Sequence, residues 1–122
     1  MILADTSIWI EFFRNGKPEL RRLLQNNQVA MHPFLIAELA LGSLHDRLST
    51  LAKLDKMPQV RIVDLRDVRR MIEARGLYAK GIGLIDAHLI ASCLATPGTV
   101  LWTSDARLDG VAASIGIRAT LP

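Results

Sequence analysis

The chain has 122 residues, 50% of them hydrophobic, and a formal net charge of +3 from 15 Lys and Arg against 12 Asp and Glu, which fits one globular domain over residues 1–122. Its single cysteine, Cys93, excludes an internal disulfide and favours a reducing compartment, so we expect the protein in the cytoplasm. No signal peptide or membrane span is expected, because no basic region precedes Asp5 and Pro97-Gly98 interrupts the longest uncharged stretch.

The first part of the chain alternates short apolar runs with helical patterns. Pro18 and Pro33 suit the first turns of helices, while Gly16 and Gly42 are typical of helix ends. Asp5 ends the first apolar run and can cap the helix that follows it. The patterns predict strands at 2–4 and 29–31, and helices over 6–15, 18–26 and 33–42.

The second part continues the same alternation. One helix is expected before Pro58, with a one-sided apolar stripe formed by Leu44, Leu48, Leu51 and Leu54. Residues 84–95 are almost entirely apolar and predict a buried helix. Further helices are expected around 66–73 and after residue 103, and further strands at 60–63, 99–102 and 117–119.

This order of elements predicts an α/β protein with three layers, α/β/α, around a short parallel sheet of four or five strands. In such sheets, functional groups gather at the carboxyl ends of the strands. Asp5 and Asp105 both follow strands there. Glu38 and Asp86 lie near the starts of helices that can face the same edge. Topology therefore predicts that these acids converge.

Four carboxylates stand out because their surroundings are apolar: Asp5, Glu38, Asp86 and Asp105. No Lys or Arg lies within three residues of the first three, and only Arg107 is close to Asp105. A carboxylate removed from water without a partner costs several kcal/mol or becomes protonated. A shared divalent cation resolves this, and ligands that are all oxygen favour Mg²⁺ or Mn²⁺ over zinc.

Each acid also has a purely structural explanation. Asp5 and Asp105 can serve only as helix caps, and Glu38 and Asp86 can pair with a distant Arg. A non-catalytic α/β binding module would need nothing more. A receiver domain is a poorer alternative, because it requires an acidic pair after the first strand and a late Lys, and no Lys follows Lys80.

Four segments of the chain resemble the motifs of PIN domains, specifically the small toxin nucleases of VapBC-type toxin–antitoxin pairs. The opening Met-Ile-Leu-Ala-Asp-Thr-Ser-Ile-Trp-Ile (1–10) is similar to the start of that family. His-Pro-Phe-Leu-Ile-Ala-Glu-Leu-Ala-Leu-Gly (32–42) resembles its second motif. The third and fourth are Gly-Ile-Gly-Leu-Ile-Asp-Ala-His-Leu-Ile-Ala-Ser (81–92) and Leu-Trp-Thr-Ser-Asp-Ala-Arg-Leu (101–108). The resemblance spans the chain and keeps the order of the motifs.

The resemblance implies a metal-dependent endoribonuclease that acts as the toxin of a type II pair. Asp5, Glu38, Asp86 and Asp105 would be both the metal ligands and the catalytic residues, with Mg²⁺ or Mn²⁺ as cofactor. RNA would be the substrate, a cognate antitoxin protein would inhibit the enzyme, and a homodimer is expected. The resemblance leaves open which RNA is cleaved and whether one or two ions bind.

Two surface hypotheses follow from the same segments. Arg14, Lys17, Arg21 and Arg22 lie close in sequence to the first motif and either grip phosphates or form a solvated helix face. The apolar residues Trp9, Phe12, Phe13 and Leu20 either pack in the core or form a groove for a partner helix.

Overall fold

The computed structural model describes residues 1–121 and places a short parallel sheet at the centre of the molecule. The strands are β1 (Ile2–Ala4), β2 (Val29–Ala30) and β3 (Val100–Trp102), in the order β2-β1-β3. Ile2 of β1 lies opposite Val29 on one side and Val100 on the other. The first strand of the chain is therefore the central strand of the sheet.

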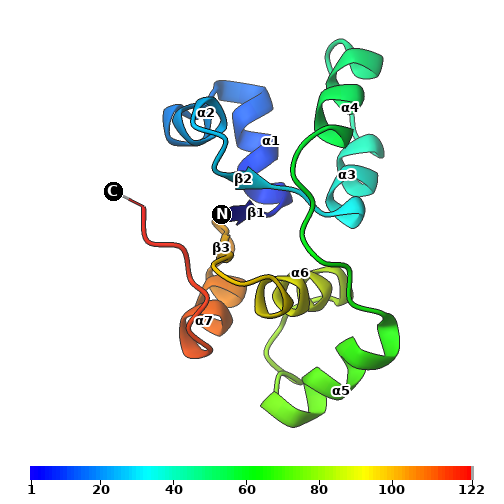
Figure 1. The fold of residues 1–122 in the computed structure, drawn as a ribbon, viewed down its shortest axis with the longest axis vertical. Helices are drawn as coiled ribbons and strands as arrows, with labels where there is room; N and C mark the ends of the chain where they lie inside the picture. The colour runs from blue at the N-terminus through cyan, green and yellow to red at the C-terminus, as the bar shows by residue number, and fades with distance from the viewer. Residues whose placement is uncertain (122) are drawn as a thin grey trace.

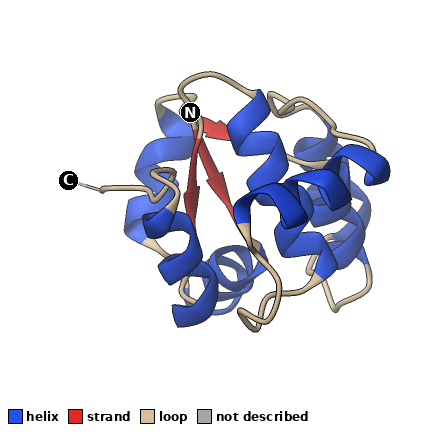
Figure 2. Ribbon diagram, turned by 90° about the horizontal axis from the view of Figure 1, so that it is seen from below, coloured by secondary structure: helices blue, strands red, loops and turns tan. Residues whose placement is uncertain are grey.

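Helices cover the sheet on both sides, as predicted for an α/β/α arrangement (Figure 2). In the orientation of Figure 1, α1 and α2 lie above the strands, α3 and α4 lie to their right, and α5 to α7 lie below them. The helices are α1 (Thr6–Asn15), α2 (Pro18–Gln25), α3 (Pro33–Ala40), α4 (Arg47–Asp55), α5 (Leu65–Arg75), α6 (Leu84–Ala95) and α7 (Ala106–Ser114).

The prediction of four or five strands is wrong, because both edges of the sheet are shorter than expected. At the β2 edge, the strand expected at 60–63 is reduced to one parallel bridge between Met31 and Gln59. The Val60 N–H donates to the Met31 carbonyl (3.0 Å), and the next N–H, that of Arg61, donates to Oγ1 of Thr96 (2.9 Å) outside the sheet. Within residues 1–121, no further residue of this segment pairs with β2.

The β3 edge ends in the same way. The strand expected at 117–119 contributes one parallel bridge, between Leu101 and Arg118. Two hydrogen bonds hold it, from Leu101 N–H to the Ile117 carbonyl (2.7 Å) and from Ala119 N–H to the Leu101 carbonyl (2.9 Å). The sheet consequently has three strands with a single bridge on each side.

The core forms where the central strand meets the helices around it. Leu3 of β1 and Leu101 of β3 are fully buried, and Trp9 of α1 is 2% exposed. The predicted all-apolar helix is confirmed as α6, whose residues 87–93 are all buried. Cys93 lies there as a buried thiol, and burial raises its pKa to about 12.

The expected leucine stripe before Pro58 is wrong in part. Asp46 adopts a left-handed conformation (φ +48°), so α4 begins only at Arg47. Leu54 is buried, but Leu48 is 85% exposed and therefore does not pack on the core. Within residues 1–121 the longest helix has 12 residues, and none is long and apolar enough to cross a membrane.

Candidate active site

The topology of the sheet gathers three of the four acids at one edge. Asp5 directly follows β1, and Asp105 lies shortly after β3, whose parallel course ends at the same edge. Glu38 is the sixth of the eight residues of α3, so it does not lie near the start of that helix as predicted. Helix α6 leads into β3 and so starts near the carboxyl ends of the strands, which places Asp86 there. The topology thus agrees with the predicted convergence for Asp5, Asp86 and Asp105, and a common site that includes Glu38 stays a prediction.

Asp5 is the most enclosed of the four acids, with 5% of its surface exposed. It caps α1, accepting from the Ser7 N–H (3.1 Å) and the Ser7 hydroxyl (2.5 Å) through Oδ1. Its Oδ2 accepts from the Thr103 hydroxyl (2.5 Å). Burial raises the pKa of Asp5, and the hydrogen bonds from Ser7 and Thr103 lower it by a smaller amount.

Thr103 and Ser7 tie the ends of β1 and β3 together. The Thr103 hydroxyl donates to Asp5 and accepts from the Asp105 N–H (3.0 Å), so one side chain links two of the acids. On the other side, the Ser104 N–H donates to the Ser7 hydroxyl (3.1 Å). The hydroxyls of Ser7 and Thr103 thus both contact Asp5.

Asp105 is exposed and caps α7. Its Oδ1 accepts from the N–H groups of Arg107 (2.9 Å) and Leu108 (3.3 Å). The structural explanation of Asp5 and Asp105 as helix caps is therefore correct. It does not exclude a metal-binding role, because in Asp105 both bonds go to the same oxygen.

Asp86 is held by a backbone donor that the sequence analysis did not identify. It lies in the first turn of α6, and its Oδ2 accepts from the N–H of Gly83 (3.0 Å). A glycine three residues before an acid at a helix start is the signal that could have revealed it. This bond orients the carboxylate at the start of α6.

Glu38 is half-buried and accepts no hydrogen bond within residues 1–121. Its pKa is raised, first by burial and then by the negative charges of Asp86 and Asp5. The negative charges of Asp86 and Asp5 therefore act on Glu38 in addition to its burial. Thr6, the other polar residue matched by the first motif, lines a groove together with Glu38.

The four acids have no cationic partner in the described chain. The ion pairs within residues 1–121 involve only other acids, which are Glu11, Asp46, Asp67 and Asp109. A structural salt bridge from Glu38 or Asp86 to a distant Arg is thus excluded for this part of the chain. The charge at the edge is left to be neutralised by protons or by a cation.

The oxygen ligands at this edge suit a hard divalent cation, but the carboxylates do not lie close enough together to bind one. Every candidate ligand is an oxygen atom, the type that Mg²⁺ and Mn²⁺ prefer. Among residues 1–121, no three His, Cys, Asp or Glu side chains lie close enough to hold one ion as they stand. The edge therefore offers carboxylates that must adjust to bind it.

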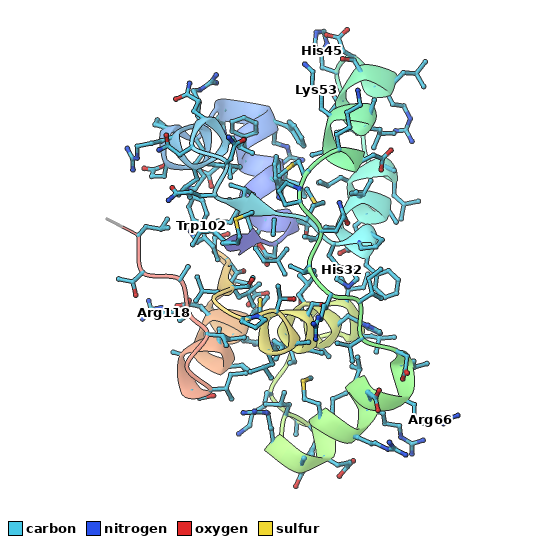
Figure 3. All side chains as sticks on the ribbon, in the orientation of Figure 1. His32, His45, Lys53, Arg66, Trp102 and Arg118 are labelled. Atoms are coloured by element: carbon cyan, nitrogen blue, oxygen red, sulfur yellow. The ribbon has the colours of Figure 1, made fainter. Side chains whose placement is uncertain are left out.

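Two histidines lie behind the acids and are part of the core. His32 lies between the start of α3 and α6 (Figure 3), with its ring centroid 6.4 Å from that of His88. Its Nδ1 accepts from the Phe34 N–H (2.9 Å), which caps α3. Burial and the neighbouring His88 lower the pKa of His32 to about 4. His88 is 4% exposed, as expected for a core residue rather than a ligand.

A groove of about 300 Å³ leads from Glu38 along α1. Its walls include Thr6, Ile10, Phe13 and Arg14 of α1 and Leu39 of α3. Phe13, which is 39% exposed, lines this groove, and its role in seating a partner helix stays a prediction. Trp9 and Leu20 are 2% and 0% exposed and pack in the core, which is the other role that the sequence allowed for them.

The basic cluster on α1 and α2 is divided between the two edges of the sheet. Arg22 lines a pocket with Met1 and Ile2, at the start of β1 and thus at the opposite edge of the sheet. Lys17 pairs with Glu11 (3.6 Å) and lies over the ring of Trp102 (5.6 Å). Arg22 is consequently remote from the candidate site, whereas Arg14 reaches the groove of Glu38 and Lys17 lies over the last residue of β3, which directly precedes Thr103.

Comparison with known proteins supports the resemblance over almost the whole chain. The family model for the PIN domain matches residues 2–114, a range that includes all four acids. Ribonuclease VapC32 of Mycobacterium tuberculosis is 39% identical over 117 residues, which cover 96% of this chain and 94% of that relative. Ribonuclease VapC11 of M. tuberculosis and VapC ribonuclease Mb1587 of Mycobacterium bovis are each 31% identical over 133 residues, covering 98% of this chain and 97% of the relative.

Proposed function

The chain belongs to the PIN-domain family and to its VapC-type ribonucleases, and we propose that it is the endoribonuclease toxin of a type II toxin–antitoxin pair. The observation that carries the catalytic assignment is the set of four acids without cationic partners. We infer that Asp5, Glu38, Asp86 and Asp105 together bind Mg²⁺ or Mn²⁺ and hydrolyse RNA phosphodiester bonds.

The four acids would have different tasks in this reaction. Asp5 and Asp105 are oriented by Thr103 and by the caps of α1 and α7, so they would supply ligands of fixed position. Asp86 is steadied by Gly83, while Glu38 is free to turn toward a cation or a water molecule. A divalent cation, when bound, would lower the pKa of water and stabilise negative charge on the phosphate.

A partner protein would keep such an enzyme inactive in its own cell. The groove beside Glu38 has an apolar wall with Ile10 and Phe13, which suits the apolar face of a short helix. A basic side chain carried past Glu38 would meet carboxylates that lack a cation. We therefore propose that the antitoxin occupies this groove, and we also expect the free protein to form a homodimer.

The decisive experiment measures cleavage of single-stranded RNA by the purified protein with Mg²⁺, with Mn²⁺ and with EDTA. We expect cleavage with either metal and none with EDTA. Asp105→Asn should abolish the reaction, while the matched variant Asp109→Asn should retain it. Asp109 lies one helical turn further along α7 and pairs with Arg118 (3.0 Å), so its loss changes the same charge outside the site. Equal activity of the two variants would contradict the assignment.

The biological side of the proposal has its own test. Expression of the wild type alone should arrest growth, and Asp5→Asn should not. Co-expression of the small open reading frame next to the gene should restore growth if it encodes the antitoxin. Harmless expression of the wild type, together with no cleavage in pure form, would refute the toxin assignment.

A further inference from the structure

A basic pocket lies along α7, the helix that Asp105 caps. It has a volume of about 390 Å³ and lies between the end of α5 and α7. Its charged lining residues are Arg75, Lys80 and Arg107, and no acid lines it. None of these three residues pairs with an acid within the part of the chain that the structure describes. Their charges are therefore available to an anion.

Arg107 connects this pocket to two of the acids. Its backbone N–H donates to Oδ1 of Asp105 (2.9 Å), and its side chain lies against Gly81. A Cβ on Gly81 would meet Cδ of Arg107 at 2.7 Å, so only glycine leaves room for this arrangement. Gly83, two residues further on, holds Asp86. The pocket thus borders the loop that positions the catalytic carboxylates.

The same loop exposes the only tyrosine of the chain. Tyr78 is 62% exposed, between Leu77 and Lys80, which both line the pocket. The following residue, Ala79, adopts a left-handed conformation (φ +58°), and Gly81 does as well (φ +78°). An exposed aromatic ring among unpaired cations is typical of surfaces that bind single-stranded nucleic acid, in which bases stack on rings and phosphates meet basic side chains.

The basic pocket on α2 lacks these features. Its Lys17 is already engaged by Glu11 and by the ring of Trp102. Arg22 lies beside the start of β1, at the edge opposite Asp5. A strand bound at Arg22 would lie at the edge opposite the acids. The pocket of Arg75, Lys80 and Arg107 is the one whose position matches the candidate active site.

We propose that Arg75, Lys80 and Arg107 bind successive phosphates of a single-stranded RNA segment on one side of the cleaved bond, while Tyr78 stacks on one of its bases. This assignment rests on the proposed ribonuclease function and adds the path of the substrate. A single strand is required, because the bases of a duplex are already stacked on one another.

The first test compares two triple variants that lose the same charge. One is Arg75→Gln/Lys80→Gln/Arg107→Gln, and the control is Arg21→Gln/Arg22→Gln/Arg66→Gln. Arg66 lies at the far end of α5 from Arg75 (Figure 3). Binding of a fluorescent single-stranded 12-nucleotide RNA is measured against salt concentration, in an Asp5→Asn background that prevents cleavage. Three lost phosphate contacts should reduce the slope of log K against log salt by about 2, and the control should keep the wild-type slope.

The second test concerns the ring of Tyr78. Tyr78→Leu should weaken binding of the same RNA by roughly 5-fold or more, the lower limit for loss of one stacked base. Tyr78→Phe keeps the ring and should bind like the wild type. The matching duplex should bind equally to all three proteins. Equal binding of single-stranded RNA by the leucine and phenylalanine variants would overturn the role of the ring.

The third test distinguishes the effect of displacing the Arg107 side chain from the effect of backbone strain at a glycine with positive φ. Gly81→Ala should raise KM for RNA more than it lowers kcat, because the new methyl group displaces Arg107. Gly98→Ala is the control, since Gly98 has nearly the same φ (+77°) but nothing within 4 Å of an added Cβ. Equal effects of the two variants would mean that only strain matters. If the wild type cleaves RNA but the Arg75/Lys80/Arg107 variant keeps the wild-type slope of log K against log salt, this inference alone is refuted. If the wild type does not cleave RNA at all, the proposed function is refuted.

Discussion

The two pairs of acids are held in different ways. Asp5 and Asp105 follow strands and are linked through the Thr103 hydroxyl, with every bond formed by a strand end or a helix start. Glu38 and Asp86 lie on helices, and of these two only Asp86 has a hydrogen bond within residues 1–121, to Gly83. The first pair is organised before any metal binds, and the second pair has freedom to move.

The two pairs therefore differ in what a bound cation would change: the strand-end pair is already ordered, whereas Glu38 of the helix pair carries an unfavourable charge. The strand-end pair has little freedom left, so its ligands would lose little entropy on binding a cation. In the helix pair, the pKa of Glu38 is raised first by burial and then by the negative charges of Asp86 and Asp5. A cation would remove that repulsion. The predictions below test each half of the comparison, from the largest expected effect to the smallest.

The largest effect is expected at Asp5. Asp5→Asn should reduce metal-dependent cleavage by more than the roughly 10- to 100-fold that is typical when a group only orients a metal ligand. Because burial raises the pKa of Asp5, its charge opposes folding without metal, and the same variant should melt at a higher temperature in EDTA. Cleavage assays and thermal melts measure the two effects. A variant that is inactive and also less stable would mean that Asp5 is needed for folding rather than for metal binding.

Thr103 tests the link within the strand-end pair. Thr103→Val leaves the Asp105 N–H without an acceptor and Oδ2 of Asp5 without a donor. We expect Mn²⁺ affinity to fall by roughly 10- to 100-fold. Thr103→Ser keeps the hydroxyl and should bind Mn²⁺ like the wild type in calorimetric titration. If valine and serine bind equally, the hydroxyl link does not organise the site.

Glu38 tests the helix pair through the pH dependence of stability. Its pKa in the folded protein is raised, so the ionised form opposes folding at neutral pH, and this penalty disappears as pH falls through the folded pKa. In EDTA, Glu38→Gln should be more stable than the wild type at pH 7, and the difference should shrink toward pH 4. Saturating Mn²⁺ should reverse the order at pH 7, because only the wild type keeps all ligands. If the stability difference between Glu38→Gln and the wild type is the same at all pH values, the pKa of Glu38 is not raised in the folded protein.

The smallest effect at neutral pH is expected at His32, which caps the helix that carries Glu38. Its pKa of about 4 lies below the ordinary 6.5, so its contribution to stability is complete above pH 6.5 and is lost as pH falls toward 4. The loss amounts to roughly 3 kcal/mol at most. His32→Asn keeps a cap acceptor without titrating, and its unfolding free energy should fall less between pH 7 and pH 4.5. If the unfolding free energy falls equally in the wild type and in His32→Asn, His32 does not cause the loss of stability in acid.

Much of the site was predictable because its chemistry is local. The apolar neighbours of Asp5, Glu38 and Asp86 and the missing cations around them are properties of adjacent residues. The capping positions of Asp5 and Asp105 are also local, since a cap contacts the N–H groups two or three residues ahead. The alternation of strands and helices then predicted one shared edge.

The sequence by itself therefore determined which residues carry the charge and which elements present them. Only the tertiary structure decided which groups orient them, because the bond from Thr103 to Asp5 joins residues 98 positions apart. It also decided that the sheet stops at three strands with a single bridge at each edge, and that Arg107 lies against Gly81. The physical reason is common to all three: each depends on a contact between segments that are distant in the chain, and neither periodicity nor spacing records such a contact.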